Sequence, residues 1–401
     1  MIMNALEKEI LAQVENNHEE VVKLRRHLHA NPELSAQEFK TQEYIEQYLD
    51  TLGLSHLRTA KTGVVTEVKG ELEGEDVIIL RADIDALPIQ EEHASSYQSQ
   101  CDGVMHACGH DAHTASLLGA LKILSVNKHL FGGTVRAIFQ PGEEIGYGAI
   151  LIEKEGHLKG ASRTFGIHLA PEVDCGKVVL MDQENNASVD AFTVKVHGKS
   201  AHVSTPEQGI DALYVASLMV SNLQGLITRT TNPMENVLIG IGKFEAGSAY
   251  NIVAQEARFE GTLRCLSVTL REEMISKMNM LCEALAKSYG ANIEIEWKSY
   301  APVLVNGEIA TKEAQGLAKR ILGETNVIER RKPALSGDDM AIFLNAAEGT
   351  YAYVGSGNDA RPETRVSIHN SHFDIDEDCL KVGVLLYSLY AMEYLNGAFK
   401  L

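Results

Sequence analysis

The sequence predicts an α/β protein in which a smaller domain is inserted into a larger one. Apolar, strand-like segments alternate with helical ones through the first half of the chain, which is typical of a sheet covered by helices on both faces. This pattern changes near Ser188 and resumes from Pro302. A chain of 401 residues also exceeds what one hydrophobic core usually organises, so two domains are expected.

The first 186 residues predict helices and strands in alternation. Helical periodicity runs over residues 5–28, and Ser35-Ala-Gln-Glu38 matches a capping box that opens a second helix ending near Gly53. The segments that follow predict a mixed, largely parallel sheet with its helices: strands at 63–68, 77–80, 134–139 and 164–167, and helices at 114–124 and 149–155.

The central segment predicts a ferredoxin-like β-α-β-β-α-β order. Its first strand shows alternating Phe192, Val194 and Val196. The remaining elements are a helix at 210–227, strands at 237–244 and 257–264, a helix at 270–288 and a strand at 293–297. We therefore predict an inserted domain over residues 187–298. The larger domain comprises residues 1–186 and 299–401. Its second part is predicted to contain helices at 308–322 and 380–395 and a strand at 351–354.

Composition and charge exclude several classes of function. A formal net charge of −19 disfavours a nucleic-acid partner, which requires a basic face. Residues 1–20 carry charges throughout and do not resemble a signal peptide, and the longest apolar run, 382–392, is too short for a bilayer and predicts a buried helix. The six cysteines show no framework, so we expect free thiols and a cytoplasmic location.

The most informative segment is a cluster of potential metal ligands just before a helix. It reads Val-Met-His106-Ala-Cys108-Gly-His110-Asp111-Ala-His113. Nitrogen, sulfur and oxygen donors in this mixture suit borderline transition metals such as zinc or manganese. The alternative is a group of packed side chains at a helix start. Further acid and imidazole sites downstream favour a metal-dependent enzyme.

Two of these downstream sites follow predicted strands, where ligands gather in α/β sheets. Glu143 and Glu144 come after a Gln-Pro-Gly turn, and in such a turn one carboxylate can bind metal while the other acts as a general base. A solvated acidic loop is the alternative. His168 ends a predicted strand, where a backbone carbonyl could satisfy it instead of a metal. Near the C-terminus, His369 and His372 compete for a similar role.

Five motifs in fixed order resemble the M20 metallopeptidases, specifically the amidohydrolase branch with N-acyl-amino-acid, hippurate and auxin-conjugate hydrolases. The resemblance extends from about residue 20 to residue 390. The motifs are Leu80-Arg-Ala-Asp83-Ile-Asp85-Ala-Leu-Pro88, Met105-His-Ala-Cys108-Gly-His110-Asp111-Ala-His113, Gln140-Pro-Gly-Glu143-Glu144, Gly166-Ile-His168-Leu and His197-Gly-Lys-Ser-Ala-His202.

The resemblance implies two divalent ions per subunit, zinc or manganese with cobalt possible, and Glu143 as the general base. The implied ligands, with Cys108 shared between the ions, are Cys108, His110, Glu144, His168 and His369. The family spacing, with the imidazole four residues before a Phe, selects His369 over His372. Asp83 and Asp85 stand where the wider family has a His-x-Asp pair, and we expect them to support ligands rather than to bind metal.

The inserted domain also contributes residues by resemblance. His202 is implied to stabilise the oxyanion in the neighbouring subunit, which implies a homodimer or a dimer of dimers and makes residues 187–298 a dimerisation and lid domain. Asn251 and Arg264 match the segment that holds the free carboxylate of the substrate, for which a planar guanidinium is suited.

The implied reaction is metal-assisted hydrolysis of the amide bond of N-acyl amino acids or short peptide-like substrates. The rival hypothesis is a catalytically inactive relative that binds metal or peptide. Retention of Glu143 and of all five implied ligands favours the enzyme. Neither the acyl group, nor the amino acid, nor the native metal follows from these residues.

Overall fold

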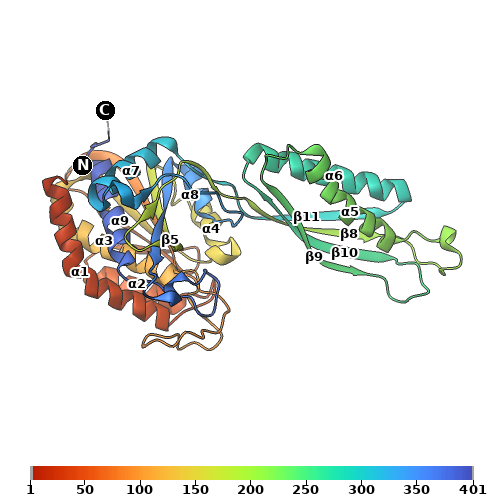
Figure 1. Ribbon diagram of the computed structural model, residues 1–401, viewed down its shortest axis with the longest axis horizontal. Coiled ribbons are helices and arrows are strands. Elements are labelled where there is room, and N and C mark those ends of the chain that lie inside the picture. Colours follow the sequence, from red (N-terminus) through yellow and green to blue (C-terminus); the bar gives the residue numbers. More distant parts are fainter. Residues whose placement is uncertain (1–2, 400–401) are drawn as a thin grey trace. The chain divides into compact units, whose positions relative to one another are not determined.

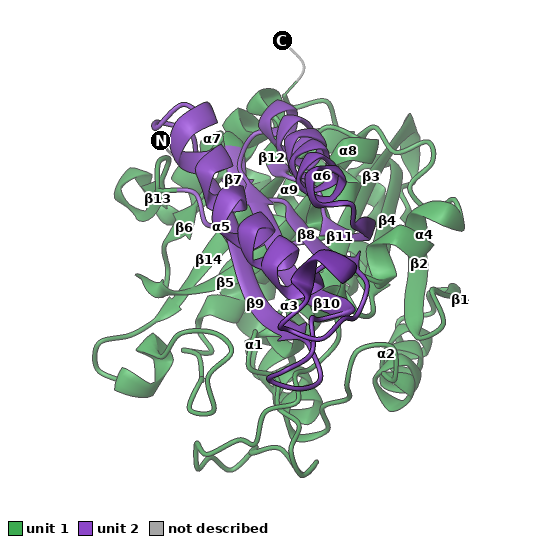
Figure 2. Cartoon of the chain, turned by 90° about the vertical axis from the view of Figure 1, so that its right-hand side faces the viewer, with its two compact units in different colours: residues 1–183, 305–332, 339–401 green, residues 184–304, 333–338 purple. Residues whose placement is uncertain are grey.

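The structure is a computed structural model, and it describes residues 3–399; residues 1–2 and 400–401, which the predicted larger domain includes, lie outside the described residues. The chain forms two compact units (Figure 2). Unit 1 contains residues 1–183, 305–332 and 339–401, and unit 2 contains residues 184–304 and 333–338. Each unit has its own cluster of buried apolar side chains.

In the described part of unit 1, eight strands form one sheet in the order β1-β2-β4-β3-β5-β14-β6-β13. Their bounds are β1 (His56–Thr59), β2 (Gly63–Lys69), β3 (Leu72–Asp83), β4 (Gly132–Gln140), β5 (Arg163–Asp174), β6 (Val178–Val179), β13 (Val327–Ile328) and β14 (Gly349–Gly357). The central pairs β4–β3, β3–β5 and β5–β14 are parallel, whereas β1–β2, β2–β4 and β14–β6 are antiparallel. The predicted mixed, largely parallel sheet is confirmed.

Helices cover this sheet on both faces (Figure 1). They are α1 (Ala5–Ala30), α2 (Phe39–Thr51), α3 (His110–Val126), α4 (Gly148–Lys154), α7 (Glu308–Leu322), α8 (Met340–Ala346) and α9 (Cys379–Leu395), with 3-10 turns η1 (Lys128–Leu130), η2 (Glu143–Ile145), η4 (Glu324–Asn326) and η5 (Pro362–Arg365). α3 and α9 pack together and on β3, and α1 packs on both helices. α4 and α8 pack together over β4 and β5. The apolar run in α9 is buried, as predicted.

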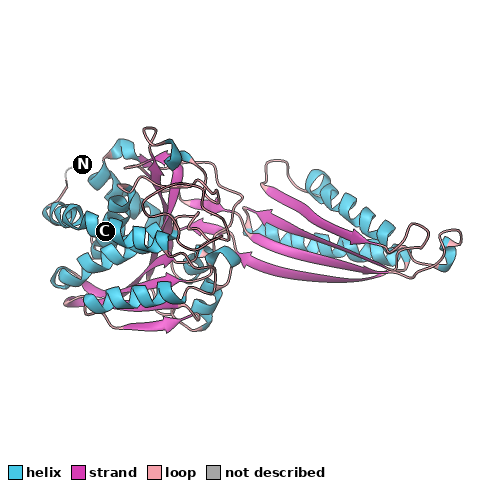
Figure 3. Cartoon of the chain, turned by 90° about the horizontal axis from the view of Figure 1, so that it is seen from below, coloured by secondary structure: helices cyan, strands magenta, loops and turns pink. Residues whose placement is uncertain are grey.

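Unit 2 has the predicted β-α-β-β-α-β order. Its helices lie beside its sheet (Figure 3). Its elements are β8 (Val189–His197), η3 (Pro206–Gln208), α5 (Ala212–Thr230), β9 (Val237–Ala246), β10 (Glu256–Cys265), α6 (Val268–Tyr289) and β11 (Asn292–Ala301). The antiparallel sheet has the order β11-β8-β10-β9. Every second residue of β8 is buried, so Phe192, Val194 and Val196 pack with Phe259 beneath the helices. β7 (Gln183–Asn186) and β12 (Leu304–Asn306) lie where the chain passes between the units.

The predicted capping box at the start of α2 was wrong. Neither side chain caps that helix: the Ser35 hydroxyl donates to Asp85 Oδ2 (2.7 Å), and Glu38 accepts hydrogen bonds from the Ala36 N–H, the Thr62 hydroxyl and the Gly142 N–H. A capping box does occur at α1, where Asn4 and Glu7 satisfy each other's backbone N–H groups. The polar residues before α2 are therefore used for contacts with distant parts of the chain.

The strand that carries His168 is longer than predicted. The sequence predicts a strand at 164–167 with His168 at its end, but β5 continues to Asp174, so that prediction was wrong. The physical reason is the different length of its two neighbours. β3 pairs with β5 only as far as Gly166, whereas β14 continues to pair beyond His168. His168 is thus inside β5 but lies past the end of the β3 ladder.

Among residues 3–399, none of the helices combines the length and the apolar character that crossing a membrane would require.

Candidate metal centre

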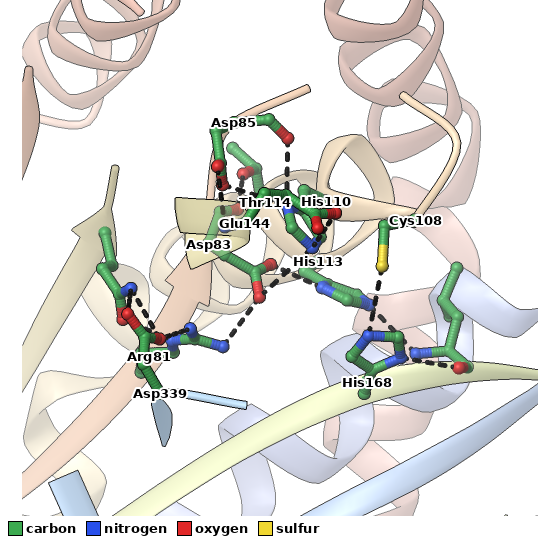
Figure 4. A network of polar contacts seen from close by, with 12 residues as sticks. Arg81, Asp83, Asp85, Cys108, His110, His113, Thr114, Glu144, His168 and Asp339 are labelled. Atoms are coloured by element: carbon green, nitrogen blue, oxygen red, sulfur yellow. Dashed lines mark hydrogen bonds and ion pairs between the residues drawn. The ribbon is translucent and has the colours of Figure 1, made fainter. Parts of the chain in front are cut away.

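Cys108 and His110 flank a glycine at the start of α3. Gly109 adopts φ 91°, a left-handed conformation that glycine accepts without strain, and a Cβ there would lie 2.8 Å from Leu169 Cδ1. The bend leaves both neighbouring side chains buried in unit 1, and Cys108 Sγ lies 3.5 Å from His168 Nε2 (Figure 4). The segment thus delivers a thiol and an imidazole to one place, as its sequence predicts.

The ring of His110 is oriented by Asp85. His110 Nδ1 lies 2.9 Å from the Asp85 backbone oxygen and 3.2 Å from Asp85 Oδ1. Both are acceptors, so Nδ1 carries a proton, and Nε2 is left as the position for a second proton or for a metal ion. His110 Nε2 is buried without a hydrogen-bond partner, 3.6 Å from Asp83 Oδ2 and 4.0 Å from Glu144 Oε1. A buried orphan nitrogen between carboxylate oxygens fits a cation.

His168 repeats this arrangement from the other side. Its Nδ1 donates to the Leu169 backbone oxygen (2.7 Å), while its Nε2 faces the Cys108 sulfur. The two alternatives that the sequence leaves open, a carbonyl partner and a metal, therefore concern different nitrogens of the same ring. With Nδ1 protonated, Nε2 has the lone pair that a metal ligand needs.

His113 lies between these rings but is fully engaged elsewhere. Its Nδ1 is 2.6 Å from Asp83 Oδ1, and its Nε2 accepts the Leu169 N–H (3.0 Å). Both nitrogens are therefore used within the protein. Asp83 in turn accepts a hydrogen bond from Arg81 Nη1 (2.7 Å), so this carboxylate orients His113 and faces His110 from the end of β3 (Figure 4).

Glu143 and Glu144 lie in the short turn η2 after β4. Gly142 and Gly146 on either side both have φ 60°, which a residue with a Cβ adopts only at a cost. Two distant carboxylates hold the turn: Glu38 Oε1 accepts the Gly142 N–H (2.9 Å), and Asp85 Oδ2 accepts the Glu144 N–H (3.1 Å). Carboxylate oxygens of the pair lie within 4.8 Å of a His110 nitrogen.

His369, and not His372, lies beside these residues. His369 Nε2 is 3.3 Å from Glu144 Oε1, and its backbone N–H donates to Ala107 O (2.7 Å). His372 is exposed and its Nδ1 lies 3.5 Å from Glu92 Oε2. The fold therefore brings His369, which is near the C-terminal end of the sequence, into contact with Ala107, the residue before Cys108.

Within the part of the chain that the structure describes, five groups of potential metal ligands occur, and two of them share Cys108. In each of these two groups the donor atoms lie within 4.8 Å of one another: Cys108 with His110 and His168, and Cys108 with Glu144 and His369. A soft thiolate with imidazole and carboxylate donors is a set that borderline divalent metals accept. The residues present thus fit two ions.

Electrostatics at these donors also favour a cation. Burial raises the pKa of the Cys108 thiol well above its ordinary value, and the Glu144 carboxylate raises it further. Burial lowers the pKa of His168 well below its ordinary value, with His113 adding to the effect, so this ring is neutral. Burial lowers the pKa of His110 too, but Asp83 and Cys108 outweigh it and raise the pKa well above its ordinary value, so in the absence of a metal ion a second proton occupies Nε2. A coordinated metal ion would hold the thiol deprotonated.

The three remaining predicted residues belong to unit 2. His202 is exposed, and its Nδ1 lies 2.6 Å from Ser204 Oγ. The backbone oxygen of Asn251 accepts the Val203 N–H (3.1 Å), which brings the segments of His202 and Asn251 together. Arg264 lies on β10, half-buried, and burial lowers the pKa of its guanidinium.

Sequence reasoning missed two residues that support the centre. Glu38, interpreted as a helix cap, instead holds the turn with Glu143 through Gly142. Arg25 contacts Asp111, the residue after His110, through an ion pair of 2.8 Å. In the sequence, Arg25 is a charged residue on the apolar side of a helix, and Glu38 is a charged residue at a helix start. Such a side chain is equally typical of an ordinary cap or a surface ion pair, so it does not single out a supporting role.

Comparisons with known proteins agree with this architecture. The model of the peptidase family M20/M25/M40 matches residues 79–393. The chain is 36% identical over 370 residues to N-acetyl-L-cysteine deacetylase of Bacillus subtilis, covering 92% of this chain and 86% of that protein. It is 33% identical over 380 residues to hippurate hydrolase of Campylobacter jejuni, covering 94% and 97%. A solved structure from Bacillus subtilis, the YXEP protein, a dinuclear metal-binding peptidase of family M20, superimposes with a TM-score of 0.82 at 33% identity over 95% of this chain and 99% of that one.

The fold, the paired donor groups and these similarities define a hydrolase of the dinuclear-metal peptidase and amidohydrolase class. The chain belongs to peptidase family M20, and its relatives include amidohydrolases that act on N-acylated amino acids. The resemblance stated from the sequence motifs is therefore confirmed.

The buried Glu38 carboxyl predicts a pH-dependent stability. Burial raises its pKa from 4.5 to about 7. Because this pKa is higher in the folded than in the unfolded chain, the stability from this group is fully present below pH 4.5 and is lost as pH rises through 7. Glu38→Gln keeps an acceptor for the Gly142 N–H and does not ionise. Relative to the parent it should gain about 2 kcal/mol of unfolding free energy between pH 5 and pH 8.

Urea unfolding of parent and variant at both pH values measures this difference. The exposed Glu9→Gln variant serves as the control and should follow the parent at each pH. Parallel pH profiles for the parent and Glu38→Gln would show that the Glu38 pKa is not raised in the folded protein.

Proposed function

We propose that the protein hydrolyses the amide bond of N-acyl amino acids or short peptide-like substrates. The observation that carries this proposal is the carboxylate pair in η2: Glu144 faces His369 at 3.3 Å, and Glu143 stands beside it in a turn held at both ends. This arrangement supports the assignment of Glu144 as a metal ligand and of Glu143 as the group that transfers protons. Two relatives are named for the deacetylation of N-acetyl-L-cysteine and the hydrolysis of hippurate, which supports this substrate class.

The proposed ligands of two divalent ions are the members of the two donor groups: Cys108, His110, Glu144, His168 and His369. Zinc, manganese and cobalt all suit this mixture of sulfur, nitrogen and oxygen. When bound, such ions polarise the substrate carbonyl and lower the pKa of a water molecule.

The proposed work of the chain's own residues is proton transfer and positioning. Glu143 accepts the proton of the attacking water and passes it to the leaving amine. His202 of a neighbouring subunit donates a hydrogen bond to the developing oxyanion, and Asn251 and Arg264 hold the free carboxylate of the substrate. These three assignments rest on the family resemblance.

The proposed arrangement divides these tasks between domains. Residues 1–186 and 299–401 form the catalytic domain, and residues 187–298 form the dimerisation and lid domain of a homodimer or a dimer of dimers. The partner is a small acylated amino acid rather than nucleic acid or membrane, and the proposed location is the cytoplasm.

A substrate panel with a base-removed variant tests the activity. We expect hydrolysis of at least one N-acyl amino acid with zinc, manganese or cobalt. Glu143→Gln should lose at least about 100-fold in kcat, the contribution of a general base, while binding as much metal as the parent. Turnover and metal content per subunit are measured together. A parent inactive on the whole panel with each metal would favour a binding protein without turnover, and a fully active variant would remove Glu143 from the mechanism.

Thiol labelling tests whether Cys108 binds metal. Because the raised pKa of Cys108 leaves little thiolate, labelling uses a small thiol reagent at alkaline pH with a long exposure; it should then modify Cys108 in the metal-free protein, and saturating metal should protect it, since a coordinated thiolate is no longer free to react. Mass spectrometry of the peptide containing Cys108 measures the extent, with the half-buried Cys101 as internal control. Equal labelling of Cys108 with and without metal would contradict coordination.

Mixed dimers test whether His202 acts across a subunit boundary. Glu143→Ala lacks its own base but still offers His202 to its neighbour, and His202→Ala has the complementary defect. If His202 acts in trans, refolding the two inactive variants together should restore activity, with about half of the dimers mixed and about a quarter of all sites complete. The mixture would stay as inactive as each parent variant, despite demonstrated subunit exchange, if the histidine acts only within its own chain.

A further inference from the structure

The guanidinium of Arg25, on α1, is completely buried in unit 1 and binds carboxylates from two distant segments. Its Nε donates to Asp111 Oδ2 (2.8 Å), and its Nη2 donates to Asp374 Oδ1 (3.0 Å). A longer contact joins Nη1 to Glu377 Oε1 (3.4 Å). One rigid, planar group therefore sets the separation of the segments that contain Asp111 and Asp374.

These two segments carry the candidate metal ligands. Asp111 directly follows His110, and Asp374 comes five residues after His369. His369 has φ 61°, an uncommon conformation for a residue with a Cβ, which persists only when the surrounding structure enforces it. Its backbone N–H donates to Ala107 O (2.7 Å), so the loop is attached beside Cys108 as well.

Other side chains complete the hold on both carboxylates. Tyr97 donates its hydroxyl to Asp374 Oδ2 (2.7 Å), and its ring lies 4.8 Å from the Arg25 guanidinium. His29 Nδ1 lies 2.8 Å from the same Asp111 oxygen that Arg25 binds. Arg25, His29, Asp111 and Asp374 are buried and Tyr97 is half-buried; both oxygens of Asp374 and one oxygen of Asp111 accept bonds in this network.

Buried ion pairs are weak evidence for stability, because the cost of removing charges from water offsets their attraction. A network of this kind placed directly behind two ligand segments suggests another role. We propose that Arg25 is a positioning residue that fixes the His369 loop against the start of α3, so that both donor groups share Cys108. This inference rests on the proposed ligand set, since it concerns the spacing of those ligands.

Arg25→Lys tests the proposal, because it keeps the positive charge and removes the planar fork. Arg163→Lys is a matched control: Arg163 is also buried, pairs with Glu313 (3.2 Å) and Glu348 (3.6 Å), and lies 4.8 Å from a tyrosine ring, but it stands at the opposite end of β5 from the centre. Both variants should unfold at lower urea concentration than the parent. Only Arg25→Lys should also weaken zinc binding, by about 10- to 100-fold, as expected for loss of a group that orients ligands.

Zinc affinity is measured by competition with a fluorescent chelator, on folded protein and without substrate. Asp374→Asn and Tyr97→Phe extend the test if Arg25→Lys does not fold. Both should lower the affinity for the zinc ion bound by Cys108, Glu144 and His369. The affinity for the ion bound by Cys108, His110 and His168 should not change.

Each outcome decides one of the two proposals. If the parent binds two zinc ions and the Arg25, Asp374 and Tyr97 variants bind both with parental affinity, the positioning role is wrong and the proposed function stands. An equal loss of zinc affinity in Arg163→Lys would also overturn the positioning role, since the loss would then result from a general decrease in stability. A parent that binds no zinc, manganese or cobalt would overturn the proposed ligand set and this inference together.

Discussion

A neutral imidazole has one protonated nitrogen and one lone pair, and the arrangement of the candidate centre depends on this constraint. His110 and His168 each present Nδ1 to a backbone oxygen, so each must present its lone pair from Nε2 to the interior of the site. His113, only one helical turn along α3, has both nitrogens occupied by Asp83 and the Leu169 N–H. Hydrogen bonds therefore distinguish the two histidines proposed as ligands from one that is fully bonded within the protein. Without a metal ion, the raised pKa of His110 means that a proton takes its buried lone pair, so this position attracts positive charge in either case.

The end of β3 provides much of this control. Asp83 binds Arg81 and His113, and Asp85 binds His110, Ser35 and the Glu144 N–H. Burying two carboxylates is costly unless donors surround them. Burial raises the pKa of Asp83, but His110 and Arg81 outweigh this and lower it well below its ordinary value, so the group stays charged. The strand thus delivers two fixed negative charges beside the place where positive charge is required.

Sequence patterns predicted the parts of this structure that depend on local chemistry. The alternation in β8 and the apolar run of α9 reflect burial of one face or of a whole helix, which leaves a regular trace in the sequence. The motifs around Cys108, Glu143 and His168 also followed from residue types. Glu38 and Arg25 could not be predicted in this way. Their partners, Gly142 and Asp374, are far away in the chain, and the same residues at a helix start or on a helix face are compatible with ordinary caps and surface pairs.

The proposed ligands and the proposed base therefore come together only when unit 1 is completely folded. Each element contributes a few donors, and each is held by contacts of long sequence separation: the η2 turn by Glu38, the His369 loop by Ala107, and the start of α3 by Arg25. Such contacts restrict the positions of the donor side chains before any ion or substrate binds. The conformational entropy of these side chains is therefore lost during folding and not during binding. The loop that carries His369 is exposed at that residue, whereas Cys108, His110 and His168 are buried. Local opening of that loop would release one ligand and leave the Cys108, His110 and His168 group intact, which makes the second donor group the more labile of the two.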